Sequence, residues 1–274
     1  MSLLLPFRRP LLGSPLWTPA RISTALWLDA ADASTITLNG STVSQWSDKS
    51  GNGRHVSQST AAGQPAYIAN ALSNKAAIRT DGFNRLEANN TSLFRNVNNA
   101  IWAVVAKHPP TLGVVNAMHV FCSTSVPQAT RFGLTANPSG NAFMGLAGRR
   151  LDADPFTTIA SSASRIVNSY FIEVGNANYE SAQANHWTNG TQDITAASFL
   201  TAGNTSDIDA SAAVIFGPVG IPSPAGTEIA EAIAIHGSLS TSNRQKLEGY
   251  LAHKWLLTAN LPNGHPFRNR PPRV

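Results

Sequence analysis

Paired carboxylates occur at short spacing at four places in the chain, and glycoside hydrolysis is the chemistry that such pairs can perform. A retaining glycosidase holds its two carboxyl groups about 5 Å apart, and an inverting one holds them about 6.5–9.5 Å apart. Glu228 and Glu231 are three positions apart, so a regular strand would place them on opposite faces. The other three pairs are Asp29/Asp32, Asp152/Asp154 and Asp207/Asp209.

A second group of oxygen-bearing residues matches part of a calcium loop. Asp48, Ser50, Asn52 and Gly53 occupy the first, third, fifth and sixth positions of a twelve-residue calcium-binding loop. The twelfth position holds Ser59, which lacks the bidentate carboxylate of such loops. The same residues also form an ordinary Asx and glycine turn, which is the interpretation we favour. Calcium at Asp48, Ser50 and Asn52 is the one cofactor that the sequence leaves open.

Residues 176–190 combine amide and aromatic side chains in the proportion expected of a sugar-binding loop. The apolar face of a pyranose stacks on an aromatic ring, and amides both donate and accept hydrogen bonds. We therefore predict Asn178, Tyr179, Asn185 and Trp187 as ligand-binding residues. The alternative is a polar connection at the edge of a sheet.

The remaining aromatic residues divide into core and surface candidates. Tyr67 and Phe83 lie among turn residues, where they could contact a ligand. Four tryptophans lie within apolar patterns and are expected in the core, namely Trp27, Trp46, Trp102 and Trp255.

Histidine and cysteine usage argues against a metal centre or a disulfide. The seven histidines never occur in the H-x-H or H-x-x-x-H spacing of a zinc site. The single cysteine, Cys122, excludes an intramolecular disulfide and a multi-cysteine zinc cluster. We read His253 and His265 as structural residues.

Short apolar runs separated by turn residues predict an all-β architecture from Ala25 onward. Asn39-Gly40 and Asn189-Gly190 favour two-residue hairpin turns. Buried strands are expected over residues 101–106, 169–174 and 212–216, and long polar loops over 123–142 and 176–185. This spacing predicts a two-sheet antiparallel jelly-roll sandwich.

One helix is expected near the C-terminus, over residues 242–257. Ser242 and Gln245 form a capping box, and Leu247, Leu251 and Trp255 then fall on one face. We expect this apolar face to pack against the sandwich.

The excess positive charge lies at the two ends of the chain. The formal net charge is +5, yet residues 29–248 contain more acids than bases. Nucleic-acid-binding domains gather their bases on a folded face, so we expect no nucleic-acid partner. No run approaches the ~18 apolar residues of a membrane span. The bases at the ends are Arg8, Arg9, Arg21, Lys254, Arg268, Arg270 and Arg273.

The first 24 residues are expected to form an extended arm before a domain over residues 25–274. Prolines at positions 6, 10, 15 and 19 favour an extended path, and many leucines make the segment too apolar for an idle tail. We predict that Phe7, Arg8, Arg9 and Trp17 are assembly contacts, on their own domain or on a neighbouring subunit. The alternative is a solvated basic tail that aids solubility.

Two sets of short motifs occur in a fixed order along the chain. They are LWLDAAD at 26–32, WSDKSGNG at 46–53, QPAY at 64–67, TDG at 80–82, EIAE at 228–231, LS at 239–240, EGYLAHKW at 248–255, LP at 261–262, HPF at 265–267 and PP at 271–272. In this order they resemble the concanavalin A-like lectin/glucanase (laminin-G-like) domains of bacteriophage structural proteins and bacterial surface proteins. The resemblance covers roughly residues 25–272 and is most specific near the C-terminus.

The resemblance implies a jelly roll that binds carbohydrate, serves in adhesion or assembly, or in some branches hydrolyses glycans. None of the four acid pairs reproduces the acidic strand of the glucanase relatives, so we expect no catalytic residues and no enzyme activity. The leading hypothesis is a phage virion structural protein, a homo-oligomer bound to other virion proteins through its ends. The alternative is a carbohydrate-binding adhesin that recognises a host surface glycan.

Overall fold

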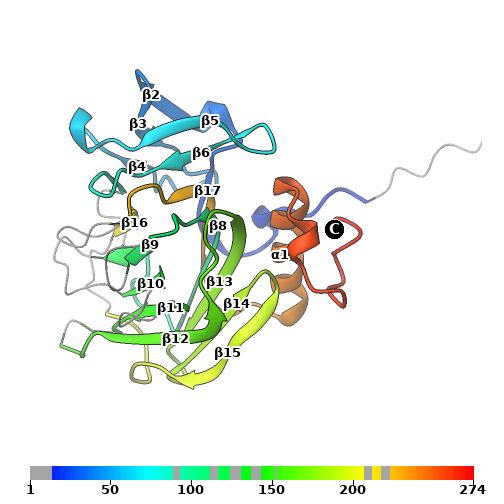
Figure 1. Cartoon of the computed structure of the whole chain (residues 1–274). Coiled ribbons are helices and arrows are strands. Elements are labelled where there is room, and N and C mark those ends of the chain that lie inside the picture. The colour runs from blue at the N-terminus through cyan, green and yellow to red at the C-terminus, as the bar shows by residue number, and fades with distance from the viewer. Residues whose placement is uncertain are drawn as a thin grey trace, which may run out of the picture.

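The computed structural model describes residues 14–88, 93–111, 117–123, 131–136, 143–151, 153–206, 212–216 and 223–274. Phe7, Arg8, Arg9, Asp152, Asp207 and Asp209 lie outside these residues, as do parts of the predicted 123–142 loop. The strands form two layers of antiparallel pairs, and the predicted two-sheet sandwich is confirmed (Figure 1).

The first sheet contains the strands that build the sites described below. Its order is β1-β17-β8-β13-β14-β15, with β6 and β5 continuing from the start of β17. Its strands are β1 Thr24–Asp29, β5 Ala66–Leu72, β6 Lys75–Arg79, β8 Asn99–Lys107, β13 Tyr170–Asn178, β14 Gln183–Thr188, β15 Thr191–Ser198 and β17 Glu228–His236.

The second sheet has the order β12-β11-β10-β9-β16-β7-β4-β3-β2. A pairing of β3 with β5, at Thr42 and Ala66, joins the two layers along one edge. Its strands are β2 Ile36–Asn39, β3 Thr42–Trp46, β4 Val56–Ser57, β7 Leu86–Glu87, β9 Ala117–Ser123, β10 Phe132–Ala136, β11 Phe143–Gly148, β12 Thr157–Ser164 and β16 Ala212–Ile215.

The expected buried strands are confirmed as β8, β13 and β16, and the β14–β15 hairpin turns at Asn189-Gly190 as predicted. The β2–β3 hairpin is also present, but its turn is one residue later, because Asn39 pairs with Thr42 and the loop is Gly40-Ser41. The two predicted polar loops are wrong in part. Residues 132–136 form the buried strand β10, and residues 176–185 continue β13 and begin β14. At the end of β13, polar residues alternate with small buried ones. A strand with one solvated face can therefore have the same composition as a loop.

Two apolar cores lie on the two faces of the first sheet. Between the sheets, Trp102 and Phe171 of the first layer pack with Phe132, Leu134 and Ile215 of the second. The expected burial of Trp27, Trp46, Trp102 and Trp255 is confirmed. The outer face of the first sheet is covered by the helix α1, Thr241–Trp255 (Figure 1).

Helix α1 confirms the expected C-terminal helix, with a different cap. The side chain of Ser240, not Ser242, accepts a hydrogen bond from the backbone N–H of Asn243. Leu247, Leu251 and Trp255 are buried against the sheet, as predicted. Within the described residues, no helix has the length and apolar character needed to cross a membrane.

Three-residue 3-10 helices complete the described secondary structure. They are Pro19–Arg21, Ala33–Thr35, Ala61–Gly63 and Thr258–Asn260.

Candidate functional site

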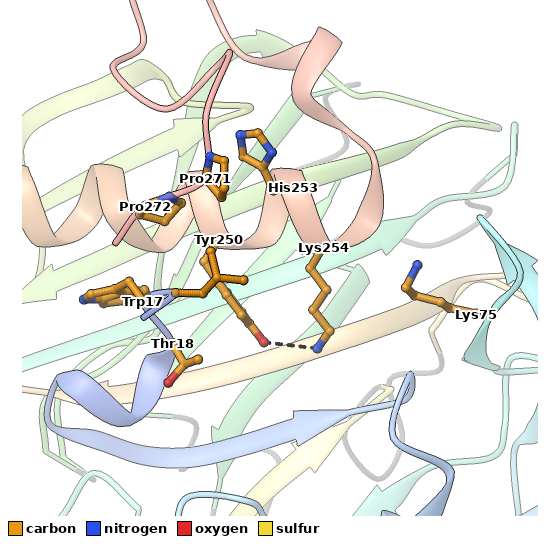
Figure 2. Close-up of a pocket in the computed structure, with 9 residues that line it drawn as sticks. Trp17, Thr18, Lys75, Tyr250, His253, Lys254, Pro271 and Pro272 are labelled. Carbon is orange, nitrogen blue, oxygen red and sulfur yellow. Dashed lines mark hydrogen bonds between the residues drawn. The ribbon is translucent and has the colours of Figure 1, made fainter. Parts of the chain in front are cut away.

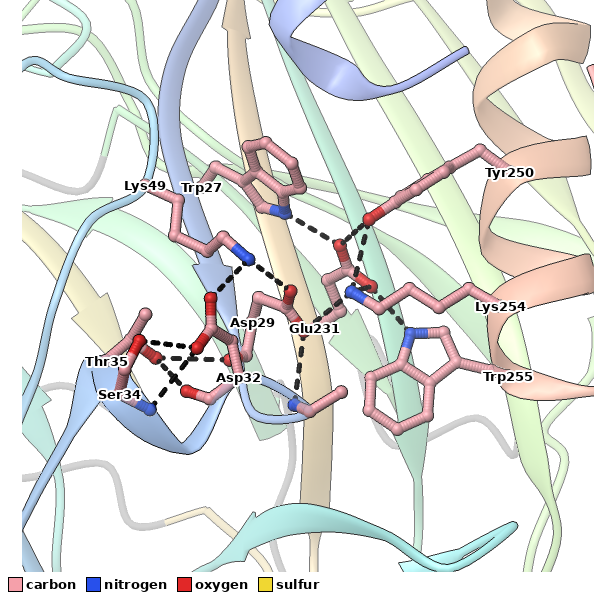
Figure 3. A network of polar contacts seen from close by, with 11 residues as sticks. Trp27, Asp29, Asp32, Ser34, Thr35, Lys49, Glu231, Tyr250, Lys254 and Trp255 are labelled. Carbon is pink, nitrogen blue, oxygen red and sulfur yellow. Dashed lines mark hydrogen bonds and ion pairs between the residues drawn. The ribbon is translucent and has the colours of Figure 1, made fainter. Parts of the chain in front are cut away.

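A buried polar network lies between the first sheet and helix α1 (Figure 3). The carboxylate of Glu231 is fully buried and accepts hydrogen bonds from Trp27 Nε1 at 2.7 Å, Trp255 Nε1 at 2.6 Å and Tyr250 Oη at 2.9 Å. The Lys254 ammonium lies 2.8 Å from the second oxygen of the same carboxylate. Burial raises the pKa of Glu231, against the attraction of Lys254. Each oxygen of this carboxylate is therefore already used inside the protein.

A β-bulge places Glu228 and Glu231 on the same face, contrary to the prediction of opposite faces. The pairing of β17 with β8 shifts register between Ile229 and Glu231, which adds one residue to β17. Glu228 lies 2.8 Å from Lys107 Nζ and 2.5 Å from an Arg79 nitrogen. The two glutamates thus share a face, but each is paired with cations.

Asp29 and Asp32 are likewise both paired with a cation. Lys49 Nζ lies 2.8 Å from a carboxylate oxygen of each aspartate, and Lys254 Nζ lies 2.6 Å from Asp29. The hydrogen bond from Lys49, helped by Ser34, lowers the pKa of Asp32 to about 2. Asp154, the described member of a third pair, accepts hydrogen bonds from its own turn and from a neighbouring threonine.

Beside this network, an apolar hollow of about 450 Å³ lies where the two ends of the chain meet (Figure 2). We call it the chain-end hollow. Its lining residues are Leu16, Trp17, Thr18, Lys75, Tyr250, His253, Lys254, Pro271 and Pro272.

The ends of the described chain are joined to each other at this hollow. Trp17 N donates to Pro272 O at 3.0 Å, and Val274 N donates to Pro15 O at 3.0 Å. Trp17 is only 3% exposed and packs edge-on against Tyr250, with ring centroids 6.2 Å apart. Trp17 therefore contacts its own domain, which is one of the two alternatives predicted for the arm.

A second hollow, of about 360 Å³, lies on the same face of the first sheet near the start of helix α1. We call it the amide hollow, because five of its lining residues carry carboxamides. Antiparallel pairing places four of them side by side on β8, β13 and β14, since Asn176 lies opposite Asn185 and Asn178 opposite Asn99. The lining residues are Asn99, Ile101, Val174, Asn176, Asn178, Asn185, Trp187, Gln192, Ser238, Leu239, Thr241 and Arg244.

Hydrogen bonds within the protein fix which end of each amide is available. Asn176 Nδ2 donates to the backbone oxygen of Ala100 at 3.2 Å and to Asn99 Oδ1 at 2.5 Å. The backbone partner identifies the nitrogen of Asn176, and through it the oxygen of Asn99. Asn176 Oδ1 and Asn99 Nδ2 therefore have no hydrogen-bond partner within the described chain.

The other three amides are fixed in the same way. Asn178 Oδ1 accepts from Ser181 N at 3.2 Å, and Asn185 Oδ1 accepts from Ala196 N at 3.0 Å. Gln192 Nε2 donates to Ile194 O at 3.2 Å and to Asn185 Oδ1 at 3.2 Å. The nitrogens of Asn178 and Asn185 and the oxygen of Gln192 are thus unused by the described residues. Together the five amides offer three donor groups and two acceptor groups.

Trp187 supplies the aromatic surface of the amide hollow. It is half-buried on β14, and the Arg244 guanidinium lies 4.6 Å from its ring centroid. Arg244 Nη1 lies 2.5 Å from Glu248 Oε1, one helical turn further along α1. Glu248 is fully buried, and its other oxygen lies 3.1 Å from His265 Nε2. The ring is therefore held by a cation that is itself held by a buried carboxylate.

Three of the four predicted ligand residues meet at this hollow, and the fourth does not. Asn178, Asn185 and Trp187 line it. Tyr179 is 1% exposed, faces the core between the sheets and donates from its hydroxyl to Arg131 O at 3.0 Å. The turn that follows β13 reverses the chain and carries this ring inward, so Tyr179 is removed from the predicted site.

The opposite face of β14 carries a buried ionic cluster that the sequence did not reveal. His186 is fully buried between Glu173, 2.6 Å from Nε2, and Asp193, 2.5 Å from Nδ1. Burial alone would lower the pKa of His186, but its bonds to Asp193 and Glu173 outweigh this effect and raise it to about 9. The cluster lies beneath the amide hollow and fixes the hairpin that carries Asn185 and Trp187.

The predicted calcium residues form a hydrogen-bonded turn. Asp48 Oδ1 accepts from the backbone N–H of Trp27 at 2.9 Å and of Ser50 at 2.8 Å, and Oδ2 accepts from Arg54 N at 3.0 Å. Asn52 Nδ2 donates to Thr24 O at 3.0 Å. Among the described residues, no three His, Cys, Asp or Glu side chains are grouped to hold a metal. Calcium at Asp48, Ser50 and Asn52 stays a prediction.

Asn99, Gln192 and Arg244 belong to the amide hollow but were not singled out from the sequence. Asn99 begins a run of apolar residues, which suggests only a strand end. The signal that could have found it is the pairing of β8 with β13, which depends on a register that no local pattern specifies. Arg244 reaches the hollow through the packing of α1 on the sheet.

Comparison with known proteins gives similar folds at low sequence identity. No family model and no curated protein sequence matches the chain. Domain 4 of AbnA, an extracellular arabinanase from Geobacillus stearothermophilus solved with arabinotriose, superposes with a TM-score of 0.57 at 13% identity, covering 82% of this chain and 98% of that domain.

Two further structures share the fold over part of their length. Botulinum neurotoxin mosaic serotype C/D, in its receptor-binding domain, gives a TM-score of 0.54 at 13% identity over 82% of this chain and 50% of that one. Trypanosoma rangeli sialidase, solved with sialic acid, gives 0.53 at 13% identity over 84% and 33%. The chain thus spans half of the toxin domain and a third of the sialidase. At this identity the similarities establish the sandwich fold alone.

Proposed function

We propose that this protein is a carbohydrate-binding module and that the amide hollow holds a short saccharide. The observation that carries the proposal is the set of unused amide groups beside Trp187, each oriented by hydrogen bonds to the protein. A sugar offers hydroxyl groups that donate and accept, together with an apolar ring face for an aromatic side chain. The hollow presents both kinds of partner in one place.

The size of the hollow and the similar structures support the same proposal. About 360 Å³ lies at the lower end of the ~300–1,000 Å³ typical of small-molecule sites, which suits the end of a glycan. The similar structures include an arabinanase domain solved with arabinotriose and a toxin receptor-binding domain. This favours the adhesin alternative over a purely structural role.

We infer binding without hydrolysis. A glycosidase needs two carboxyl groups facing the sugar, and the residues lining the amide hollow include no aspartate or glutamate. Glu248, the acid that pairs with Arg244, is fully buried and does not line the hollow. The expected readout is a retained, uncleaved oligosaccharide.

A glycan array probed with the full chain and with Trp187→Ala tests the proposal. We expect the wild type to bind one class of saccharide and the variant to bind it at least tenfold more weakly, a change of about 1.4 kcal/mol. Phe83→Ala is the matched control, because Phe83 is 84% exposed, does not line the hollow, and should leave binding unchanged.

Because Trp187 packs beside α1, circular dichroism and thermal unfolding must show that the variant is folded. Trp187→Phe should retain part of the affinity. Equal binding by the wild type and a folded Trp187→Ala would place the glycan elsewhere and contradict the proposal.

Attachment of the joined chain ends to a phage particle is a second candidate function. The observation that favours it is that Arg273 Nη1 donates to Ser14 O at 2.5 Å, so the first described residues lie beside the basic C-terminal residues. Deleting residues 1–13 should leave a folded domain and abolish incorporation into particles, measured by mass spectrometry of purified heads and tails. Normal incorporation of the deletion would remove this role.

A further inference from the structure

Arg244 is the single charged residue among those that line the amide hollow, and its charge is already compensated. Its Nη1 lies 2.5 Å from Oε1 of Glu248, a carboxylate with no exposed surface. A charged ligand in the hollow would meet this pair as a unit of zero net charge. The attraction of the guanidinium for an anion is largely cancelled by the carboxylate directly behind it.

The unused amide groups point to the same ligand chemistry. Two of them, Asn176 Oδ1 and Gln192 Oε1, can only accept hydrogen bonds. A ligand carboxylate or sulfate also only accepts, so it would leave these oxygens unpaired and set like partial charges against each other. A sugar hydroxyl can donate to these oxygens and accept from the amide nitrogens of Asn178 and Asn185.

Removing an anion from water adds to this mismatch. Transferring an ionised group out of water without a matching cation costs far more free energy than transferring a hydroxyl that is hydrogen-bonded in the site. Recognition of a carboxylate by arginine is strongest when the guanidinium fork is open to it. Here one guanidinium nitrogen of Arg244 is paired with Glu248, and the guanidinium lies over the ring of Trp187.

We propose that the amide hollow selects uncharged saccharides and discriminates against those that carry a carboxylate or sulfate, because the Arg244–Glu248 pair is neutral. The proposal rests on the carbohydrate-binding function proposed above and specifies its ligand class. Glu248 acts here as a positioning residue: it contacts no ligand, and it compensates the charge of Arg244, which lines the hollow.

The test compares matched neutral and acidic ligands. The wild type is titrated by calorimetry with the best neutral oligosaccharide from the array and with its uronic-acid counterpart, oxidised at C6. We expect the neutral ligand to bind at least tenfold more tightly. Glu248→Gln removes the compensating charge and leaves Arg244 cationic, so the ratio of the two affinities should fall several-fold in favour of the acidic ligand.

A second measurement on the wild type is independent of whether Glu248→Gln folds. Affinity for the acidic ligand should stay nearly the same between 50 and 500 mM salt, because the neutral Arg244–Glu248 pair forms no ion pair with it; exposed ion pairs are screened over that range. Tighter binding of the acidic ligand, equal binding of the two, or an unchanged ratio in folded Glu248→Gln would overturn the proposal. Binding of acidic glycans that Trp187→Ala abolishes would overturn the ligand class while keeping the site; no glycan binding would overturn both.

Discussion

The two hollows on the outer face of the first sheet lie toward opposite ends of helix α1 and differ in how their polar groups are used. Tyr250 and Lys254 line the chain-end hollow, and both are hydrogen-bonded to Glu231. Thr241 and Arg244 line the amide hollow, beside amides with unused donors and acceptors. Polar groups that satisfy one another stabilise a fold, whereas oriented groups without partners can bind a ligand.

The same contrast divides the two faces of strand β14. Asn185 and Trp187 face the amide hollow, and His186 between them faces the sandwich interior, paired with Glu173 and Asp193. Alternation along one strand thus places binding groups directly above a stabilising cluster. If this division is correct, substitutions in the satisfied regions should change unfolding, and substitutions in the hollow should change binding.

The largest expected effect is that of Glu231→Ala. The substitution leaves the N–H groups of Trp27 and Trp255 and the hydroxyl of Tyr250 without their acceptor, in a buried site. Breaking a buried ionic network from one side costs ~3–5 kcal/mol, and we expect Tm to fall by about 10 °C. Denaturant unfolding and a thermal melt measure this change.

Glu87→Ala is the matched control for that substitution. Glu87 pairs with Arg85 at 3.4 Å, and both side chains are about a third exposed, so its loss should cost less than about 1 kcal/mol. Saccharide affinity, measured at a temperature where both variants are folded, should match the wild type. Weakened binding in folded Glu231→Ala would show that the two regions are coupled.

The next largest effect concerns His186 and is read as a dependence of stability on pH. The pKa of His186 is about 9 in the folded protein against an ordinary value of 6.5, so the folded state retains a proton that the unfolded state releases. The contribution is fully present below pH 6.5 and is lost as pH rises to about 9, a total of ~3 kcal/mol.

Urea unfolding at intervals from pH 6 to pH 9 measures this dependence. His186→Gln should flatten the slope of the unfolding free energy in that window, whatever its absolute stability. A wild-type stability that stays level or rises across the window would contradict a charged His186 between two carboxylates.

The sequence predicted the elements of the fold better than the contacts between them. Hairpin turns, buried strands and the helix follow from local patterns, as at Asn189-Gly190 and in the apolar face of α1. The β-bulge before Glu231 was not predicted, because it depends on pairing with β8 rather than on any local residue. It reversed the expected orientation of one glutamate and so created the network.

The candidate site was predicted in part for the same reason. Asn178, Asn185 and Trp187 share one hairpin, where composition is informative. Tyr179 was misplaced because a single residue in a turn can face either way, and Asn99 and Arg244 come from elements distant in sequence. The spacing of four residues on a helix predicts that Arg244 pairs with Glu248. The position of Arg244 over the ring of Trp187 could not be predicted from the sequence.

The smallest expected effect is that of Asn178→Ala. It tests whether a single amide of the amide hollow serves ligand binding rather than stability. Asn178 is half-buried, its oxygen accepts only from Ser181 N, and its nitrogen is unused by the described residues. Losing one hydrogen bond to a neutral saccharide should weaken binding about 3- to 10-fold, or ~0.5–1.5 kcal/mol. Calorimetry with the ligand identified on the array measures this change, and Ser181→Ala, which keeps the backbone donor, should bind as the wild type does. A loss of stability in Asn178→Ala that exceeds its loss of binding would mean that the amide serves the turn rather than a ligand, and the contrast between the two hollows would fail at this residue.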